Sequence, residues 1–80
     1  MPVNKNHFHK SIWIYVTDIQ TKNQIKITTK ILNAEPSILE WSVDIEDIDN
    51  VLRVESENLK EKHIQFLLEK QGFTCTPMVG

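Results

Sequence analysis

The sequence predicts one small α+β domain, and three observations support this. The chain has 80 residues, of which 40% are hydrophobic, enough for a single core. Four segments have the composition or the alternation of β-strands, and two have the period of amphipathic helices. Their order is strand, helix, strand, strand, helix, strand within residues 11–77. We expect residues 1–10 to form a flexible polar leader and residues 78–80 a short tail.

The first strand is expected at residues 12–17, which are β-branched or aromatic throughout. Its alternate positions form an aliphatic set, made up of Ile12, Ile14 and Val16. The other positions form a set with two aromatic rings, made up of Trp13, Tyr15 and Thr17. We expect the aliphatic set to meet the helices. The aromatic set would then lie on the opposite face, partly exposed.

The first helix is expected at residues 22–33, after a polar turn in which Asp18 or Thr21 acts as the cap. One stripe of this helix faces a core and contains Ile25, Thr28, Ile31 and Leu32. A second stripe, with a spacing of four residues, is basic and contains Lys22, Lys26 and Lys30. The helix ends near Asn33, before Pro36.

The next two strands are expected at residues 38–45 and 51–55, and the acidic turn between them makes a hairpin. Trp41 shares its parity with Leu39 and Val43, so it belongs either to the core or to an exposed aromatic patch with Trp13 and Tyr15. The acidic run lacks the glycine and the glutamate of a calcium loop, which favours a solvated hairpin tip.

The second helix is expected to start at Asn58, with Glu61 completing a capping box, and to end before Gly72. A short last strand at residues 73–76 stops at Pro77. Two strand-helix-strand halves joined by a hairpin predict the ferredoxin-like βαββαβ arrangement. Its two helices lie on one face of a four-stranded antiparallel sheet.

Composition excludes several classes of function. Nine Lys and Arg against eleven Asp and Glu give a net charge of −2, which speaks against a nucleic-acid binder. No apolar stretch approaches the roughly 18 residues of a membrane span, and the start does not resemble a signal peptide. The single cysteine, Cys75, suits a reducing, cytoplasmic setting. Cys75 and His63 lack an orienting third group, and no glycine-rich phosphate loop is present, so we expect no enzyme.

Four segments of the chain resemble the heavy-metal-associated (HMA) domains of copper chaperones and metal-pumping ATPases. The resemblance covers residues 12–76 and is carried by Ile31-Leu32-Asn33, Ile38-x-x-Trp41-x-Val43-Asp44, Val51-Leu52-Arg53-Val54 and Gln71-Gly72-Phe73. The resemblance implies a Met-x-Cys-x-x-Cys loop after the first strand, whose thiolates hold Cu(I) or Zn(II). In this chain Thr21 and Gln24 stand where the cysteines belong, and Lys22 adds a positive charge between them. Hydroxyl and carboxamide groups do not replace thiolates for soft Cu(I).

Our first functional hypothesis is therefore a degenerate HMA-like domain without a cofactor. It would act as a protein-interaction or regulatory module linked to metal homeostasis, as a monomer or weak dimer. Its partner would be another protein domain. The docking surface that the resemblance implies comprises Thr21, Lys22, Asn23, Lys26 and Phe73.

The alternative hypothesis is a copper or zinc carrier with unusual ligands. Its ligands would be Cys75, His7 and His9, or the cysteine of a second chain. A free cysteine is more often a small buried hydrophobe, and two histidines fall short of the four ligands of a structural zinc site.

Overall fold

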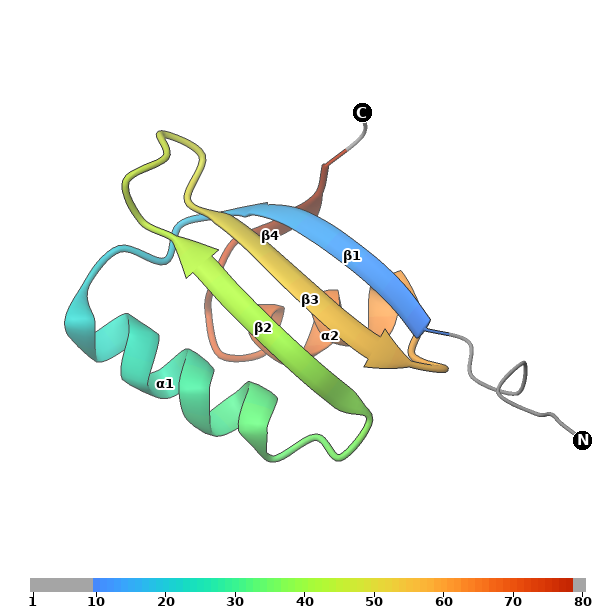
Figure 1. Cartoon of the computed structure of the whole chain (residues 1–80). Coiled ribbons are helices and arrows are strands. Elements are labelled where there is room, and N and C mark those ends of the chain that lie inside the picture. The colour runs from blue at the N-terminus through green and yellow to red at the C-terminus, as the bar shows by residue number, and fades with distance from the viewer. Residues whose placement is uncertain (1–9, 79–80) are drawn as a thin grey trace, which may run out of the picture.

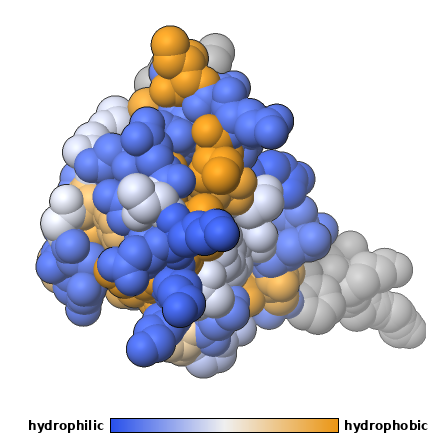
Figure 2. Space-filling view, turned by 90° about the vertical axis from the view of Figure 1, so that its left-hand side faces the viewer, coloured by the Kyte–Doolittle hydropathy of each residue, from blue (hydrophilic) through white to orange (hydrophobic). Residues whose placement is uncertain are grey.

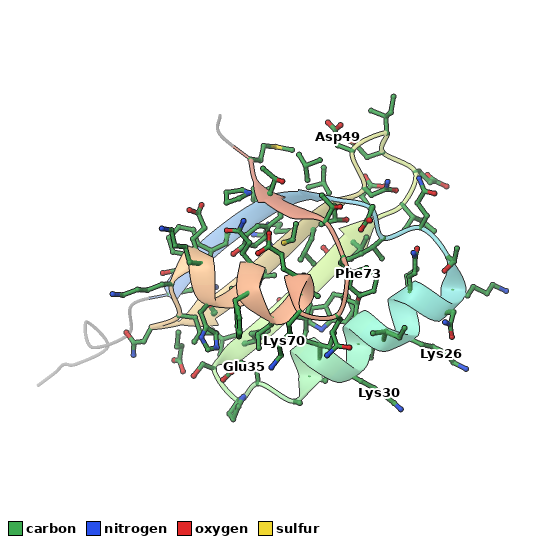
Figure 3. All side chains as sticks on the ribbon, turned by 180° about the vertical axis from the view of Figure 1, so that it is seen from behind. Lys26, Lys30, Glu35, Asp49, Lys70 and Phe73 are labelled. Carbon is green, nitrogen blue, oxygen red and sulfur yellow. The ribbon has the colours of Figure 1, made fainter. Side chains whose placement is uncertain are left out.

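A computed structural model describes residues 10–78, and it contains all six predicted elements in the predicted order (Figure 1). They are β1 (Lys10–Thr17), α1 (Lys22–Asn33), β2 (Ile38–Asp44), β3 (Val51–Glu57), α2 (Glu61–Glu69) and β4 (Cys75–Pro77). The sheet order is β2-β3-β1-β4, and all neighbouring strands are antiparallel. Both helices lie on the same face of this sheet, which faces the viewer in Figure 3. The arrangement confirms the α+β prediction and is consistent with a ferredoxin-like fold.

The predicted orientation of β1 was wrong. Tyr15 is fully buried and lies opposite Leu52 on β3, and Trp13 lies opposite the buried Val54. The aliphatic set faces the side of the sheet without helices, where Ile12 is 47% exposed. The aromatic rings are larger than the aliphatic side chains, so burying them removes more apolar surface from water. Alternation along a strand separates two faces, but it does not say which face meets the helices.

The core lies between the sheet and the helices. Its buried members come from five of the six elements and the loops, and are Tyr15, Ile19, Leu32, Leu52, Val54, Ile64, Leu68, Phe73 and Cys75. Trp41 packs against this cluster opposite Val54, and its indole Nε1 donates to Asn33 Oδ1 at 2.9 Å. The core interpretation of Trp41 is therefore confirmed, and no aromatic patch forms on the open face of the described sheet.

The high content of β-branched residues in α1 is accommodated inside the helix. Thr28 is fully buried, and its hydroxyl donates to the Gln24 carbonyl at 2.9 Å. Thr29 donates to the Ile25 carbonyl at 2.7 Å in the same way. Each buried or half-buried hydroxyl thus has a partner within its own helix, so the helix tolerates them.

Several predicted boundaries were shifted. β1 begins at Lys10, the last residue of the segment that we predicted as a leader. α2 has Lys60 rather than Asn58 as its N-cap, and no side chain bonds to its free N–H groups. Asn58 instead adopts a left-handed φ of 58° after β3, which runs on to Glu57. Thr74 lies in the loop before β4, because only Cys75–Pro77 pair with β1.

Candidate docking surface at the start of helix α1

The loop between β1 and α1 is closed by two side chains that bond to each other's backbone. Thr21 is the N-cap of α1, and its Oγ1 accepts from the Gln24 N–H at 3.1 Å. Gln24 Oε1 in turn accepts from the N–H groups of Thr21 at 3.0 Å and of Gln20 at 2.8 Å. This pair forms a capping box, which satisfies N–H groups that a helix start leaves without a partner. It confirms Thr21 as the cap.

The two capping residues occupy the positions at which the HMA resemblance implies metal-binding cysteines. Both side-chain oxygens that face the loop are already acceptors for backbone N–H groups. Thr21 and Gln24 also present oxygen where soft metals prefer sulfur. The loop is therefore closed by hydrogen bonds between its own residues, and no bound ion is needed to close it.

Three loops are joined beneath this turn. Thr17 at the end of β1 donates from its hydroxyl to the Asn50 carbonyl at 2.6 Å and accepts from the Ile19 N–H at 3.2 Å. Asp18 Oδ1 accepts from the Thr74 N–H at 2.9 Å, which connects the loop before β4. Ile19 is fully buried under the turn. These contacts hold the β1–α1, β2–β3 and α2–β4 loops together at one end of the domain.

Most of the predicted surface residues are exposed at this end. Thr21, Lys22, Asn23 and Lys26 all face solvent. Phe73 does not, because it is only 8% exposed and packs in the core. The resemblance implied that Phe73 belongs to a docking loop. Its ring is buried instead, because burial removes a large apolar surface from water.

Helix α1 carries an open hollow on its surface. It is lined by Asn23, Ile25, Lys26, Ile27, Thr29 and Lys30. The labelled Lys26 and Lys30 point away from the sheet in Figure 3. Lys22, Lys26 and Lys30 form no ion pair with any residue of the segment 10–78. This face, which we call the basic α1 face, therefore combines unpaired positive charge with apolar surface.

The β2–β3 loop carries the opposite charge. Asp44, Glu46, Asp47 and Asp49 are all exposed, as the solvated hairpin tip predicts. Two carboxylates bond to nearby N–H groups, Asp44 to Glu46 at 3.1 Å and Asp47 to Asp49 at 2.8 Å. Sequence reasoning missed Ile48 at the apex of this loop, which is 92% exposed. The signal that could have predicted this exposure is its position in an acidic turn, where no neighbouring apolar residues form a period with it.

Cys75 is poorly placed to be a metal ligand. It is fully buried in β4, opposite Thr17. Burial raises the pKa of its thiol to about 12, and the nearby charges of Glu69 and Asp18 act in the same direction. Only the thiolate binds metal or acts as a nucleophile, so this environment disfavours both roles.

The structure does not bring the predicted histidine and cysteine ligands together. His7 and His9 lie outside the described residues. His63 is on α2, where its Nε2 lies 3.3 Å from Glu35 Oε2. Within residues 10–78, no group of three or more His, Cys, Asp or Glu side chains is arranged to hold a metal ion. No helix in the same range is long and apolar enough to cross a membrane.

Comparison with solved structures finds a similar fold. The apo form of the HMA domain of a copper chaperone for superoxide dismutase superposes on this chain with a TM-score of 0.77. The two sequences are 16% identical, and the match covers 99% of this chain and 78% of that one. No family model and no curated relative matches the sequence. At this identity the likeness establishes an HMA-like fold.

Proposed function

We propose that this chain is a metal-independent, non-enzymatic protein-interaction module built on an HMA-like scaffold. Its docking surface is the basic α1 face together with the turn that precedes it. The likeness to a chaperone's HMA domain supports a role beside a metal-homeostasis system. The single buried thiol suits a reducing, cytoplasmic setting.

The observation that carries this proposal is the reciprocal capping box of Thr21 and Gln24. A cysteine pair at these positions would offer two thiolates to a soft metal ion. Here hydrogen bonds between the same positions close the turn, and Lys22 between them places a positive charge where a cation would bind. The start of α1 is thus available as a preformed surface without metal.

The carrier alternative receives less support from the described residues. Its cysteine is buried and has a raised thiol pKa, so loading a metal on Cys75 would require the core to open around β4. We therefore do not develop it as a second function, but its ligands enter the test below.

The test is a competition titration of the reduced, full-length protein with Cu(I) and Zn(II) against a chromogenic chelator. We expect the wild type to bind neither ion more tightly than about micromolar, because no thiolate pair is present. The matched gain-of-function control is the double variant Thr21→Cys/Gln24→Cys. We expect it to bind one Cu(I) per chain at least about 1,000-fold more tightly than the wild type, because thiolates are the preferred ligands of soft Cu(I).

Two further variants identify any unexpected ligand. Stoichiometric uptake by the wild type that is lost in Cys75→Ser, or in His7→Ala/His9→Ala, would overturn the proposal in favour of the carrier. Unchanged weak binding in all three proteins would support it. Failure of the double-cysteine variant to bind Cu(I), while it remains folded by circular dichroism, would show that the turn is not equivalent to an HMA metal loop.

A further inference from the structure

Two surfaces of opposite charge extend from the end of the domain where the three loops meet, and the basic one continues along α1 to Lys30 in its last turn. One is the basic α1 face, which carries Lys22, Lys26 and Lys30 and the hollow that the half-buried Ile27 helps to line. The other, which we call the acidic tip, consists of residues 44–49, with Ile48 at its apex. Figure 2 views the domain from this end and shows hydrophobic surface projecting at the top, next to hydrophilic side chains.

The two surfaces do not neutralise each other within one chain. None of the lysines of the basic α1 face pairs with a carboxylate of residues 10–78. The acidic tip likewise forms no ion pair in this range, and its carboxylates bond only to backbone N–H groups. Both surfaces therefore keep their charge available to a second molecule.

Each surface also includes apolar side chains. Ile48 is 92% exposed, and keeping an aliphatic side chain in water is unfavourable relative to burying it. The hollow on α1 is lined by the half-buried Ile25 and Ile27 as well as by Lys26 and Lys30, and both isoleucines also pack against the core. An isoleucine flanked by Asp47 and Asp49 complements a hollow flanked by two lysines in both apolar character and charge.

The acidic tip is tied to the strand that leads into α1. Thr17 is bonded to the last residues of this loop twice. Its N–H donates to the Asp49 carbonyl at 3.1 Å, and its hydroxyl donates to the Asn50 carbonyl at 2.6 Å. Thr17 precedes the N-cap of α1, Thr21, by one short loop. A two-fold axis relates two copies so that each presents its acidic tip to the basic α1 face of the other.

We infer that the partner of the basic α1 face is a second copy of this chain, bound through its acidic tip in a reciprocal dimer. This inference rests on the proposed function, because it names the partner of the same surface. In the dimer, Ile48 of each copy enters the hollow on α1 of the other, and Asp47 and Asp49 face Lys26 and Lys30. Two identical contacts form, one on each side of the axis.

The first test is sedimentation equilibrium of the full-length protein at low and high ionic strength. We expect a reversible monomer–dimer equilibrium that weakens at least about tenfold between 0.02 and 0.5 M salt, because the contact depends on screened charges. Ile48→Ser should weaken it by about tenfold or more through the lost apolar burial. Leu39→Ser is the matched control, because Leu39 is 51% exposed but lies outside both surfaces.

The second test exchanges the charges. We expect Lys26→Glu/Lys30→Glu and Asp47→Lys/Asp49→Lys each to remain monomeric alone, since each pairs like charges in both contacts. Mixed in equal amounts they should form a heterodimer, because both contacts then regain opposite charges. Lys60→Glu/Lys62→Glu, which reverses two exposed lysines at the start of the other helix, should dimerise as the wild type does. Circular dichroism checks that each variant is folded.

A wild type that stays monomeric at roughly 0.5 mM and low salt would overturn the dimer. Charge-exchanged variants that associate alone, or that fail to associate when mixed, would do the same. A larger assembly instead of a dimer would exclude the two-fold arrangement. The metal titration is independent of all these outcomes, so a failure of the dimer is distinguishable from a failure of the proposed function.

Discussion

The starts of the two helices are held by different means. α1 begins with Thr21, whose side chain and that of Gln24 bond to the loop backbone, so neighbouring residues close the turn. α2 begins at Lys60 without a side-chain cap. Two side chains of β1 instead bond to the backbone around this start: the Tyr15 hydroxyl donates to the Glu61 carbonyl at 2.7 Å, and Trp13 Nε1 donates to the Leu59 carbonyl, just before the N-cap, at 2.9 Å.

The locally closed start of α1 belongs to the surface, and the start of α2 is held by residues of the core. The start of α1 is complete without distant contacts, so its side chains stay exposed for a partner. The start of α2 depends on aromatic rings that cross the core, and burial raises the pKa of Tyr15 well above its usual value. The Tyr15 hydroxyl therefore stays protonated and keeps its donor role at physiological pH. The following predictions test whether the start of α1 is held by neighbouring residues and the start of α2 by residues distant in the sequence.

Tyr15→Ala should have the largest effect on stability. It removes a fully buried ring together with the bond to Glu61, and we expect the free energy of unfolding to fall by about 3–5 kcal/mol. Tyr15→Phe keeps the ring and should lower it by about 1 kcal/mol, because the Glu61 carbonyl loses its donor. Urea denaturation followed by circular dichroism measures both. Equal stability of Tyr15→Phe and the wild type would show that the hydroxyl does not hold α2.

Thr21→Ala should have a smaller effect, because the lost contacts are local and exposed. We expect a loss of about 1 kcal/mol in the free energy of unfolding, and little loss for Thr21→Ser, which keeps the acceptor oxygen. In a double-mutant cycle, Thr21→Ala and Gln24→Ala should cost less together than the sum of the two, because they share one capping box. Strict additivity would contradict the reciprocal box.

Lys60→Ser should have the smallest effect, and of the opposite sign. Lys60 already has the extended backbone of an N-cap, with φ −85° and ψ 153°. A serine there supplies the missing acceptor, so we expect a gain of about 0.5–1 kcal/mol in the free energy of unfolding. Lys60→Ala is the control, since it removes the lysine without adding an acceptor. A serine variant no more stable than the alanine variant would mean that α2 needs no cap.

Local signals in the sequence predicted much of the fold and part of the candidate site. The change of period at Lys22, the Thr21 cap and the exposed basic stripe were all confirmed. These features depend on residues three or four positions apart, which interact in any context that permits a helix. The exposed Ile48 and the buried Phe73 were not predicted, because their exposure depends on which loops meet at one end of the sheet.

The sequence by itself determined the order of the six elements and narrowed the cap of α1 to Asp18 or Thr21, because periodicity and capping act between near neighbours. Only the tertiary structure decided which face of β1 meets the helices and how α2 begins. Both faces of β1 are apolar, so the choice rests on pairing with Leu52 and Val54 and on partners that lie 46 residues away. Such contacts are absent from any local pattern, because they exist only once the sheet and the helices have assembled.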